Sequence, residues 1–141
     1  MSERLIVRQD HHFGTGFWAV DAHDPEADEF QPVEGLHDLT PYGMMLASLA
    51  GCTSILINSY AQNHHIALDE VEIHLAYDRV FDEDCKDCEP QETFREEIQE
   101  EIFFHGNLTT QERQKLFQVS LQCPIHKIFE GGIQIKSALG E

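Results

Sequence analysis

The chain has 141 residues, a length typical of one domain, and its hydrophobic share of 41% suffices for a core without disulfides or a structural metal. Its 26 acidic residues against nine lysines and arginines give a formal net charge of −17. A surface this acidic repels phosphate backbones and anionic membranes, so we expect neither a nucleic-acid partner nor membrane binding.

Two features predict a cytoplasmic protein made of a single domain over residues 1–141. The N-terminus has no basic segment that leads into an apolar one, so no signal peptide is predicted. The longest apolar stretch is interrupted by Ser48, Thr53, Ser54 and Asn58 and is expected to fall short of a membrane span. Thiols stay reduced in the cytoplasm, so the four cysteines are expected to be catalytic, metal-binding or inert.

The N-terminal part of the chain predicts short strands and turns. Residues 5–7 form a brief β-like run, and residues 17–20 follow the turn signal Gly14-Thr15-Gly16. Residues 21–38 are rich in acidic side chains, which predicts a loop that contributes little to the core.

A long helix is predicted from Thr40 to the region of Asn63. Thr40 is a good N-cap, and Pro41 suits the first helical position because its missing N–H would be unpaired there. Apolar residues follow at helical spacing, and residues 44–57 carry no charge. A helix that is apolar nearly all round belongs in the middle of a fold or between subunits.

Two strands are predicted after this helix. Apolar and polar residues alternate along residues 71–78, which indicates a half-buried strand. The acidic loop that follows holds Cys85 and Cys88. Residues 94–104 fit both a helical and a strand pattern, and their place between a strand and a Gly106-Asn107 turn favours the strand.

A capping box of Thr109 and Glu112 predicts a helix that runs to Cys123. Its inward-facing residues are expected to be Leu116, Phe117, Ser120 and Leu121. A second, short helix is predicted over residues 125–130, because a proline precedes it and two glycines follow it. Residues 133–137 predict a last strand, and the order of elements indicates an α+β fold.

Cys52 allows two interpretations. It shares a helical stripe with Met45, Leu49 and Leu56, and a free cysteine in such a stripe is often a small buried hydrophobe. A nucleophilic Cys52 needs a nearby cation that favours its thiolate. The sequence has no lysine or arginine between positions 38 and 72, so that cation must come from elsewhere in the fold or from a second chain.

The other cysteines also leave alternatives open. Cys123 precedes the short helix, whose positive end lowers a thiol pKa with help from His126, or it is a helix-end residue without a role. Cys85 and Cys88 have CxxC spacing, which is typical of half a zinc site or of a redox pair. The acidic residues around them raise a thiol pKa, which disfavours a reactive thiolate.

Three spaced motifs resemble the OsmC/Ohr family. Residues 41–53, PYGMMLASLAGCT, are similar to the family's central-helix motif, and residues 123–128, CPIHKI, to its second motif. Residues 84–89, DCKDCE, look like a DCxDCE loop of one OsmC-like branch, and residues 106–113 match the GxLxxxER segment of that branch. The resemblance covers about residues 40–139 in the correct order.

The resemblance implies an OsmC-like fold, with antiparallel strands around a long central helix, in an intertwined homodimer with both central helices at its middle. It also implies that Cys52 is the peroxidatic thiolate and Cys123 the resolving thiol. Cys52 would attack the distal oxygen of an organic hydroperoxide, Cys123 would close a disulfide, and an external dithiol would reduce it again. No cofactor is expected for this chemistry.

The resemblance further implies an arginine at the thiolate, supplied from the N-terminal strand region. Its position makes Arg8 the first candidate and Arg4 the second, with Arg79 as a possible substitute. Strongly active family members carry a glutamate beside the start of the central helix, where this chain has Tyr42 and Gly43. This departure weakens the prediction that the chain is an enzyme.

The sequence therefore supports three alternative functions. Peroxiredoxin-like reduction of hydroperoxides in oxidative-stress defence ranks first. A zinc-binding or redox-sensing module at Cys85 and Cys88 ranks second. A non-catalytic dimer that holds a small apolar ligand ranks third.

Overall fold

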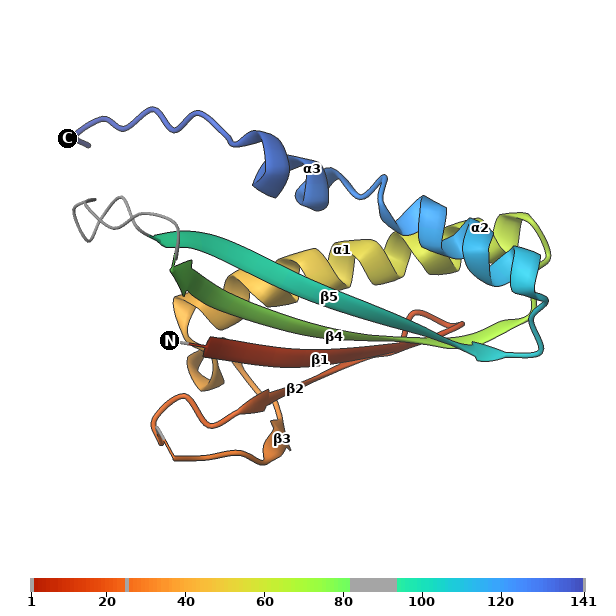
Figure 1. Cartoon of the computed structure of the whole chain (residues 1–141), viewed down its shortest axis with the longest axis horizontal. Helices are drawn as coiled ribbons and strands as arrows, with labels where there is room; N and C mark the ends of the chain where they lie inside the picture. Colours follow the sequence, from red (N-terminus) through yellow and green to blue (C-terminus); the bar gives the residue numbers. More distant parts are fainter. Residues whose placement is uncertain (1, 25, 82–93, 141) are drawn as a thin grey trace.

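The computed structural model describes residues 2–24, 26–81 and 94–140 (Figure 1). Its sheet has five antiparallel strands in the order β3-β2-β1-β4-β5. The strands are β1 (Ser2–Asp10), β2 (Thr15–Val20), β3 (Phe30–Pro32), β4 (Leu68–Phe81) and β5 (Phe94–Gly106). The helices are α1 (Pro41–Asn63), α2 (Thr110–Ser120) and α3 (Pro124–Gly131), with a short 3-10 helix over Leu36–Asp38. This mixed architecture confirms the predicted α+β class.

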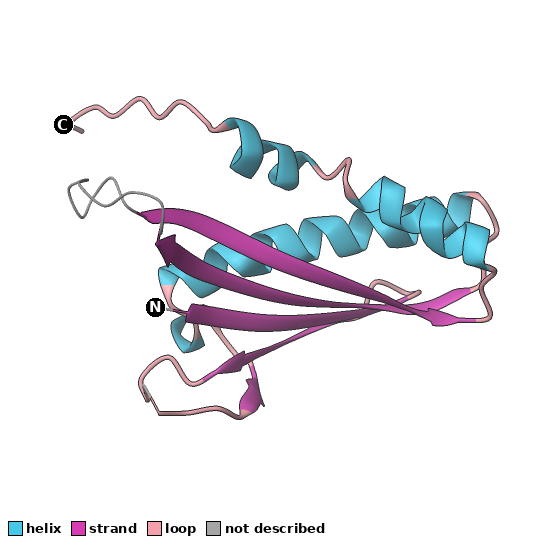
Figure 2. Cartoon of the chain, in the orientation of Figure 1, coloured by secondary structure: helices cyan, strands magenta, loops and turns pink. Residues whose placement is uncertain are grey.

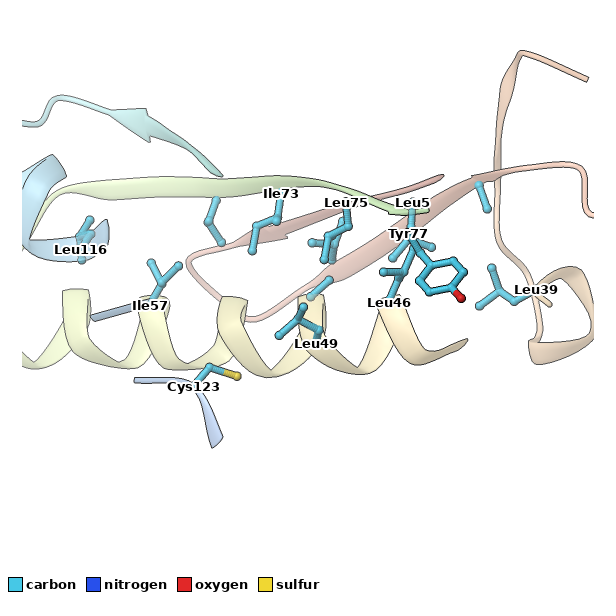
Figure 3. Close-up of a cluster of buried hydrophobic side chains, with 14 of the residues drawn as sticks. Leu5, Leu39, Leu46, Leu49, Ile57, Ile73, Leu75, Tyr77, Leu116 and Cys123 are labelled. Carbon is cyan, nitrogen blue, oxygen red and sulfur yellow. The ribbon is translucent and has the colours of Figure 1, made fainter. Parts of the chain in front are cut away.

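The core lies between one face of the sheet and α1 (Figure 3). Leu46, Leu49 and Ile57 of α1 meet Leu5 of β1 and Ile73 of β4, and all of these side chains are buried. The helices α2 and α3 follow along α1 (Figure 2). The long uncharged helix is therefore covered by the sheet on one side and by two shorter helices on another.

The start and end of α1 confirm the sequence prediction. The Thr40 hydroxyl accepts a hydrogen bond from the backbone N–H of Gly43 (3.1 Å), Pro41 occupies the first turn, and the helix ends at Asn63. The expectation that this stretch is too short for a membrane span was wrong, because α1 is long and apolar enough for one. The described fold buries 44% of the most apolar window of this helix.

A buried chain of amide groups fixes how α1 is rotated on the sheet. The Asn58 side-chain N–H donates to the Gln9 amide oxygen (2.8 Å), and the Gln9 N–H donates to the Thr15 hydroxyl (2.9 Å). Asn58 and Gln9 are each about 1% exposed, so neither has water as a substitute partner. Any rotation of α1 would leave buried polar groups without hydrogen bonds.

Strand alternation gives the sheet two distinct faces. Val7 of β1 and Val71 and Ile73 of β4 are fully buried against α1. Neighbouring residues of a strand point to opposite faces, so Arg8 and Glu72 lie on the face turned away from α1. We call this the outer face.

The predicted capping box at the start of α2 is confirmed. The Glu112 backbone N–H donates to the Thr109 hydroxyl (3.1 Å), and the Thr109 N–H donates to the Glu112 carboxylate (2.9 Å). The helix ends at Ser120, three residues earlier than predicted. Leu116 is buried as expected, but Phe117 is 46% exposed because one helical step turns it about 100° away from Leu116.

The predicted strand over residues 133–137 was wrong. After α3, residues 132–140 have no regular secondary structure, and this tail runs away from the sheet (Figure 1). Ile133, Ile135 and Leu139 are exposed by 68%, 81% and 98%. A strand needs a neighbouring edge for its backbone hydrogen bonds, and the tail lies beside none in the described part of the chain.

The segment between β2 and α1 is more ordered than the predicted loop over residues 21–38. It contains β3 and the 3-10 helix. The Val33 N–H donates to the Phe17 carbonyl (2.8 Å), and Leu39 is buried just before α1. The segment therefore closes one end of the core.

Candidate active site

Cys52 lies half-buried in the middle of α1, one turn after the buried Leu49. The amide chain through Asn58 sets the rotation of α1 and so directs Cys52. Cys52 packs at the margin of the core rather than inside it. Its position therefore fits a thiol that a small reactant can approach from one side.

Cys123 is fully buried and forms the N-cap of α3. Its carbonyl accepts the Lys127 N–H (3.1 Å), which starts the helix, and its own N–H donates to the Ser120 carbonyl (3.3 Å). Figure 3 shows Cys123 on the side of α1 opposite to the strands. The turn between α2 and α3 thus carries this thiol to the middle of α1.

The two thiols lie near each other. The Cys123 side chain acts on the pKa of Cys52, although about 70 residues separate the two in sequence. The motif resemblance had paired these residues without showing that they are close. The geometry brings them together, and both are free thiols.

Burial raises the pKa of the Cys52 thiol, and the neighbouring Cys123 thiol raises that pKa further. The backbone N–H of Ile125 acts in the opposite direction, since a nearby donor favours the thiolate. Ile125 belongs to the first turn of α3, where backbone N–H groups lack helical partners. The N-terminal end of α3 therefore favours the Cys52 thiolate. Burial outweighs this effect and holds the pKa of the Cys52 thiol above its ordinary value.

A cavity of about 500 Å³ lies between α1, β5 and α3. Neither cysteine lines it, but Leu49, one turn before Cys52, and His126, three residues after Cys123, do. Its apolar walls include Met45 and Leu49 of α1 and Phe129 of α3. Glu100 also lines it, and burial raises the pKa of that carboxyl. One Glu100 oxygen is buried without a hydrogen-bond partner among the described residues. The cavity therefore combines apolar walls with one acidic side chain.

His126 pairs with a neighbour on its own helix. Its Nε2 lies 2.8 Å from the Glu130 carboxylate, one turn further along α3. The ring lines the cavity together with Glu100, and its help to Cys123 stays a prediction from the sequence.

The family model described as OsmC-like protein matches residues 34–138, which is most of the chain. The chain belongs to the OsmC-like family. No protein with a curated description matches it. Among solved structures, an OsmC-like hydroperoxide resistance protein from Jannaschia sp. CCS1 is similar, with a TM-score of 0.61, 15% identity, and coverage of 99% of this chain and 94% of that one. At this identity the likeness shows the fold, and it confirms the predicted OsmC-like architecture.

The arginines predicted for this OsmC-like site lie on the outer face. Arg8 forms an ion pair with Glu70, and Arg4 lies 2.7 Å from Asp28. Within one chain the sheet separates both guanidinium groups from Cys52. Among the described residues, no lysine or arginine contributes to the Cys52 pKa. The cation that the sequence analysis required is therefore not supplied by this chain's described residues.

The start of α1 has a carboxylate that the sequence analysis missed. Tyr42 stacks on Tyr77 with ring centroids 4.7 Å apart, and the Tyr77 O–H donates to Glu96 of β5 (2.7 Å). Arg79 lies 3.8 Å from the same Glu96 carboxylate. An arginine and a glutamate thus meet at the helix start even though Tyr42 and Gly43 carry no charge. Only the register of β4 and β5, which places Arg79 opposite Glu96, could have revealed this pair.

Cys85 and Cys88, the predicted zinc or redox pair, lie outside the described residues. The assignment of the chain to a DCxDCE branch of the OsmC-like family rests on the same segment and on the GxLxxxER match at residues 106–113. Both remain predictions from the sequence.

Proposed function

We propose that this OsmC-like protein reduces organic hydroperoxides through Cys52 and Cys123 and so contributes to defence against peroxides. The observation that carries the proposal is that the fold brings these two thiols near each other. The similar Jannaschia protein is named for hydroperoxide resistance, which supports the same general role. Neither thiol needs a cofactor for this reaction.

The reaction begins with the Cys52 thiolate, which attacks the terminal oxygen of R–O–O–H. A sulfur–oxygen bond forms, the O–O bond breaks, and the alkoxide takes up a proton to leave as the alcohol. Sulfur is oxidised to the sulfenic acid while the peroxide is reduced. The Cys123 thiol then attacks the Cys52 sulfur, forms the disulfide and releases water. An external dithiol returns both cysteines to thiols by exchange.

The first turn of α3 supports the thiolate that this reaction needs. The Ile125 N–H lowers the pKa of Cys52 and would stabilise negative charge on its sulfur. Burial opposes this effect, so a cation must complete the site. Because Arg8 lies on the outer face, it can serve Cys52 only from a second chain. Arg79, beside the start of α1, is the alternative.

The cavity between α1, β5 and α3 suits the organic part of the hydroperoxide. Leu49 and Met45 provide an apolar wall one and two turns before Cys52, and Phe129 provides another. We infer that an alkyl or aryl group lies there with its peroxide directed at Cys52. Hydrogen peroxide would gain nothing from these walls and is expected to react more slowly.

We further infer a cytoplasmic homodimer. Ile55 and Met44 expose 52% and 37% of their surface on the central helix, which has no charged residue to keep that side in water. Ile135 of the tail is 81% exposed. A second copy that covers these residues would bury apolar surface that this chain alone leaves in solvent.

The test adds one equivalent of cumene hydroperoxide to the reduced protein and follows intact mass with peptide mapping. A loss of two hydrogens that maps to Cys52–Cys123 is expected. The Cys123→Ser variant should instead gain one oxygen at Cys52, and Cys52→Ser should not react. An unchanged mass, or a bond between Cys85 and Cys88, would overturn the proposal in favour of a binding function.

A further inference from the structure

The outer face carries a cluster of ionisable side chains that the peroxidase proposal does not use. We call it the outer-face cluster and define it as Glu70, Glu72 and His74 of β4, His105 of β5 and Arg8 of β1. The sheet lies between this cluster and the two thiols. It therefore needs an explanation of its own.

Strand geometry gathers these side chains. Glu70 and Glu72 lie two residues apart on one strand and so share a face. His105 is the direct partner of Glu70 on β5. The donor atoms of Glu70, Glu72 and His105 all lie within 4.8 Å of one another. Neighbouring strands of a rigid sheet therefore hold two carboxylates and one imidazole together.

Hydrogen bonds fix the orientation of the central carboxylate. One Glu72 oxygen lies 3.1 Å from His105 Nε2, and its other oxygen lies 2.5 Å from His74 Nε2. His74 in turn packs edge-on against Phe103, with ring centroids 5.0 Å apart. Glu72 thus directs one oxygen at His105 while His74 holds the other. This is how outer groups orient the ligands of protein metal sites.

The three donor atoms match the preferences of a borderline divalent cation such as zinc. Zinc binds imidazole nitrogen and carboxylate oxygen at about 2.0–2.2 Å in tetrahedral geometry, so its ligand atoms lie about 3.3 Å apart. The separation of 3.1 Å between Glu72 and His105 is already close to that value. Glu70 needs only a small side-chain rotation, since it lies within the same 4.8 Å. Calcium and magnesium prefer sets made only of oxygen, which the imidazole argues against.

Charge also favours a cation at this position. Glu70 and Glu72 share one guanidinium, because Arg8 pairs with Glu70 and lies 3.8 Å from Glu72. Their side chains are only 25% and 22% exposed, so water screens them incompletely. A divalent ion would replace Arg8, which is 49% exposed and can turn into solvent. The overall charge of −17 raises the local concentration of cations further.

We propose that Glu70, Glu72 and His105 form a zinc-type metal site on the outer face, with His74 as the residue that positions Glu72. Three protein ligands leave a fourth tetrahedral position for water. This site is distinct from the Cys85 and Cys88 pair. It also does not depend on the peroxidase proposal.

The experiment titrates zinc into the full chain that carries Cys85→Ser and Cys88→Ser, with binding followed by calorimetry. One ion per chain is expected to bind. His105→Ala and Glu72→Gln should weaken binding at least 10–100-fold, the cost typical of groups that only support a ligand. Arg8→Gln should tighten binding, because it removes the competing cation. His64→Ala, which changes an exposed histidine at the end of α1, is the matched control and should leave affinity unchanged.

Cobalt in place of zinc reports the donor atoms. A tetrahedral d–d spectrum without thiolate charge-transfer bands supports the proposed set of two carboxylates and an imidazole. Three results would overturn it: no zinc bound by the serine variant, undiminished affinity after His105→Ala, or a thiolate band that assigns the metal to Cys52 and Cys123.

Discussion

Oxidation of Cys52 and Cys123 to a disulfide should raise the free energy of unfolding. The size of the increase depends on the number of residues between the two cysteines. A disulfide between them closes a loop of about 70 residues, and the chain-entropy model then gives about 4 kcal/mol of stabilisation. Strain in the folded state would reduce that value. The two thiols already lie near each other in the folded chain, so a bond between them should need only a local rearrangement. We therefore expect most of this stabilisation of about 4 kcal/mol to be measurable in the oxidised protein.

Urea unfolding of oxidised and reduced protein measures this difference. With a slope near 2 kcal/mol per molar, the unfolding midpoint should rise by about 2 M on oxidation. Both forms should carry Cys85→Ser and Cys88→Ser and be compared at one protein concentration, because a dimer's stability depends on it. Cys52→Ala should show no shift. An oxidised midpoint at or below the reduced one would refute the proximity of the thiols.

Substitutions at Glu100, at Thr109 and at the neighbours Leu116 and Phe117 test burial and capping in the fold. Glu100→Gln should stabilise the chain by about 1 kcal/mol at pH 7–8, because burial raises the pKa of Glu100 and its charged form therefore lowers the stability of the folded state. This gain should vanish near pH 4, below the pKa of the carboxyl in the unfolded chain. Urea unfolding measured across this pH range tests both expectations. Thr109→Ala should cost about 1 kcal/mol by loss of the capping box, and Thr109→Ser should retain it in thermal unfolding. Leu116→Ala should cost about 2–5 kcal/mol in urea, whereas Phe117→Ala should cost less than about 1 kcal/mol. Equal costs for these last two would contradict their burial.

Capping residues and short-range patterns in the sequence were enough to predict where the helices α1 and α2 begin. Thr40 and Pro41 fixed the start of α1, and Thr109 with Glu112 fixed that of α2, because capping groups satisfy N–H groups that have no helical partner. Alternation along residues 71–78 fixed the inward face of β4. These predictions succeeded because each depends on interactions between residues a few positions apart.

Predictions that needed a distant partner were wrong or incomplete. Residues 133–137 have the alternation of a strand, but the pattern does not say which edge they would pair with. Arg8 is near Cys52 in neither sequence nor structure, since β1 turns it to the outer face. The Glu96 carboxylate at the start of α1 depends on the β4–β5 register. Only the motif resemblance brought Cys52 and Cys123 together in advance.

Two features of the single chain would both be explained by a second copy of the chain packed against α1. Cys52 lacks a cation among the described residues, and burial raises its pKa. Ile55, one turn further along α1, is 52% exposed on an uncharged helix. A second copy packed on this side would bury Ile55 and bring charged groups of its own toward Cys52. The thiol pKa should then depend on assembly, while a buried structural cysteine would show no such dependence.

The variant Ile55→Glu tests this dependence directly, because a charge at the centre of the interface should favour monomers. Its Cys52 should react with iodoacetamide only at higher pH than in the parent protein, since its thiolate would lose the partner's cation. Phe117→Glu changes an apolar residue of similar exposure on α2 and should leave both assembly and the pH profile unchanged. A monomeric Ile55→Glu protein with the parent's pH profile would show that the thiolate is stabilised within one chain. In that case the Ile125 N–H and Arg79 would have to supply the stabilisation that we assign to the partner.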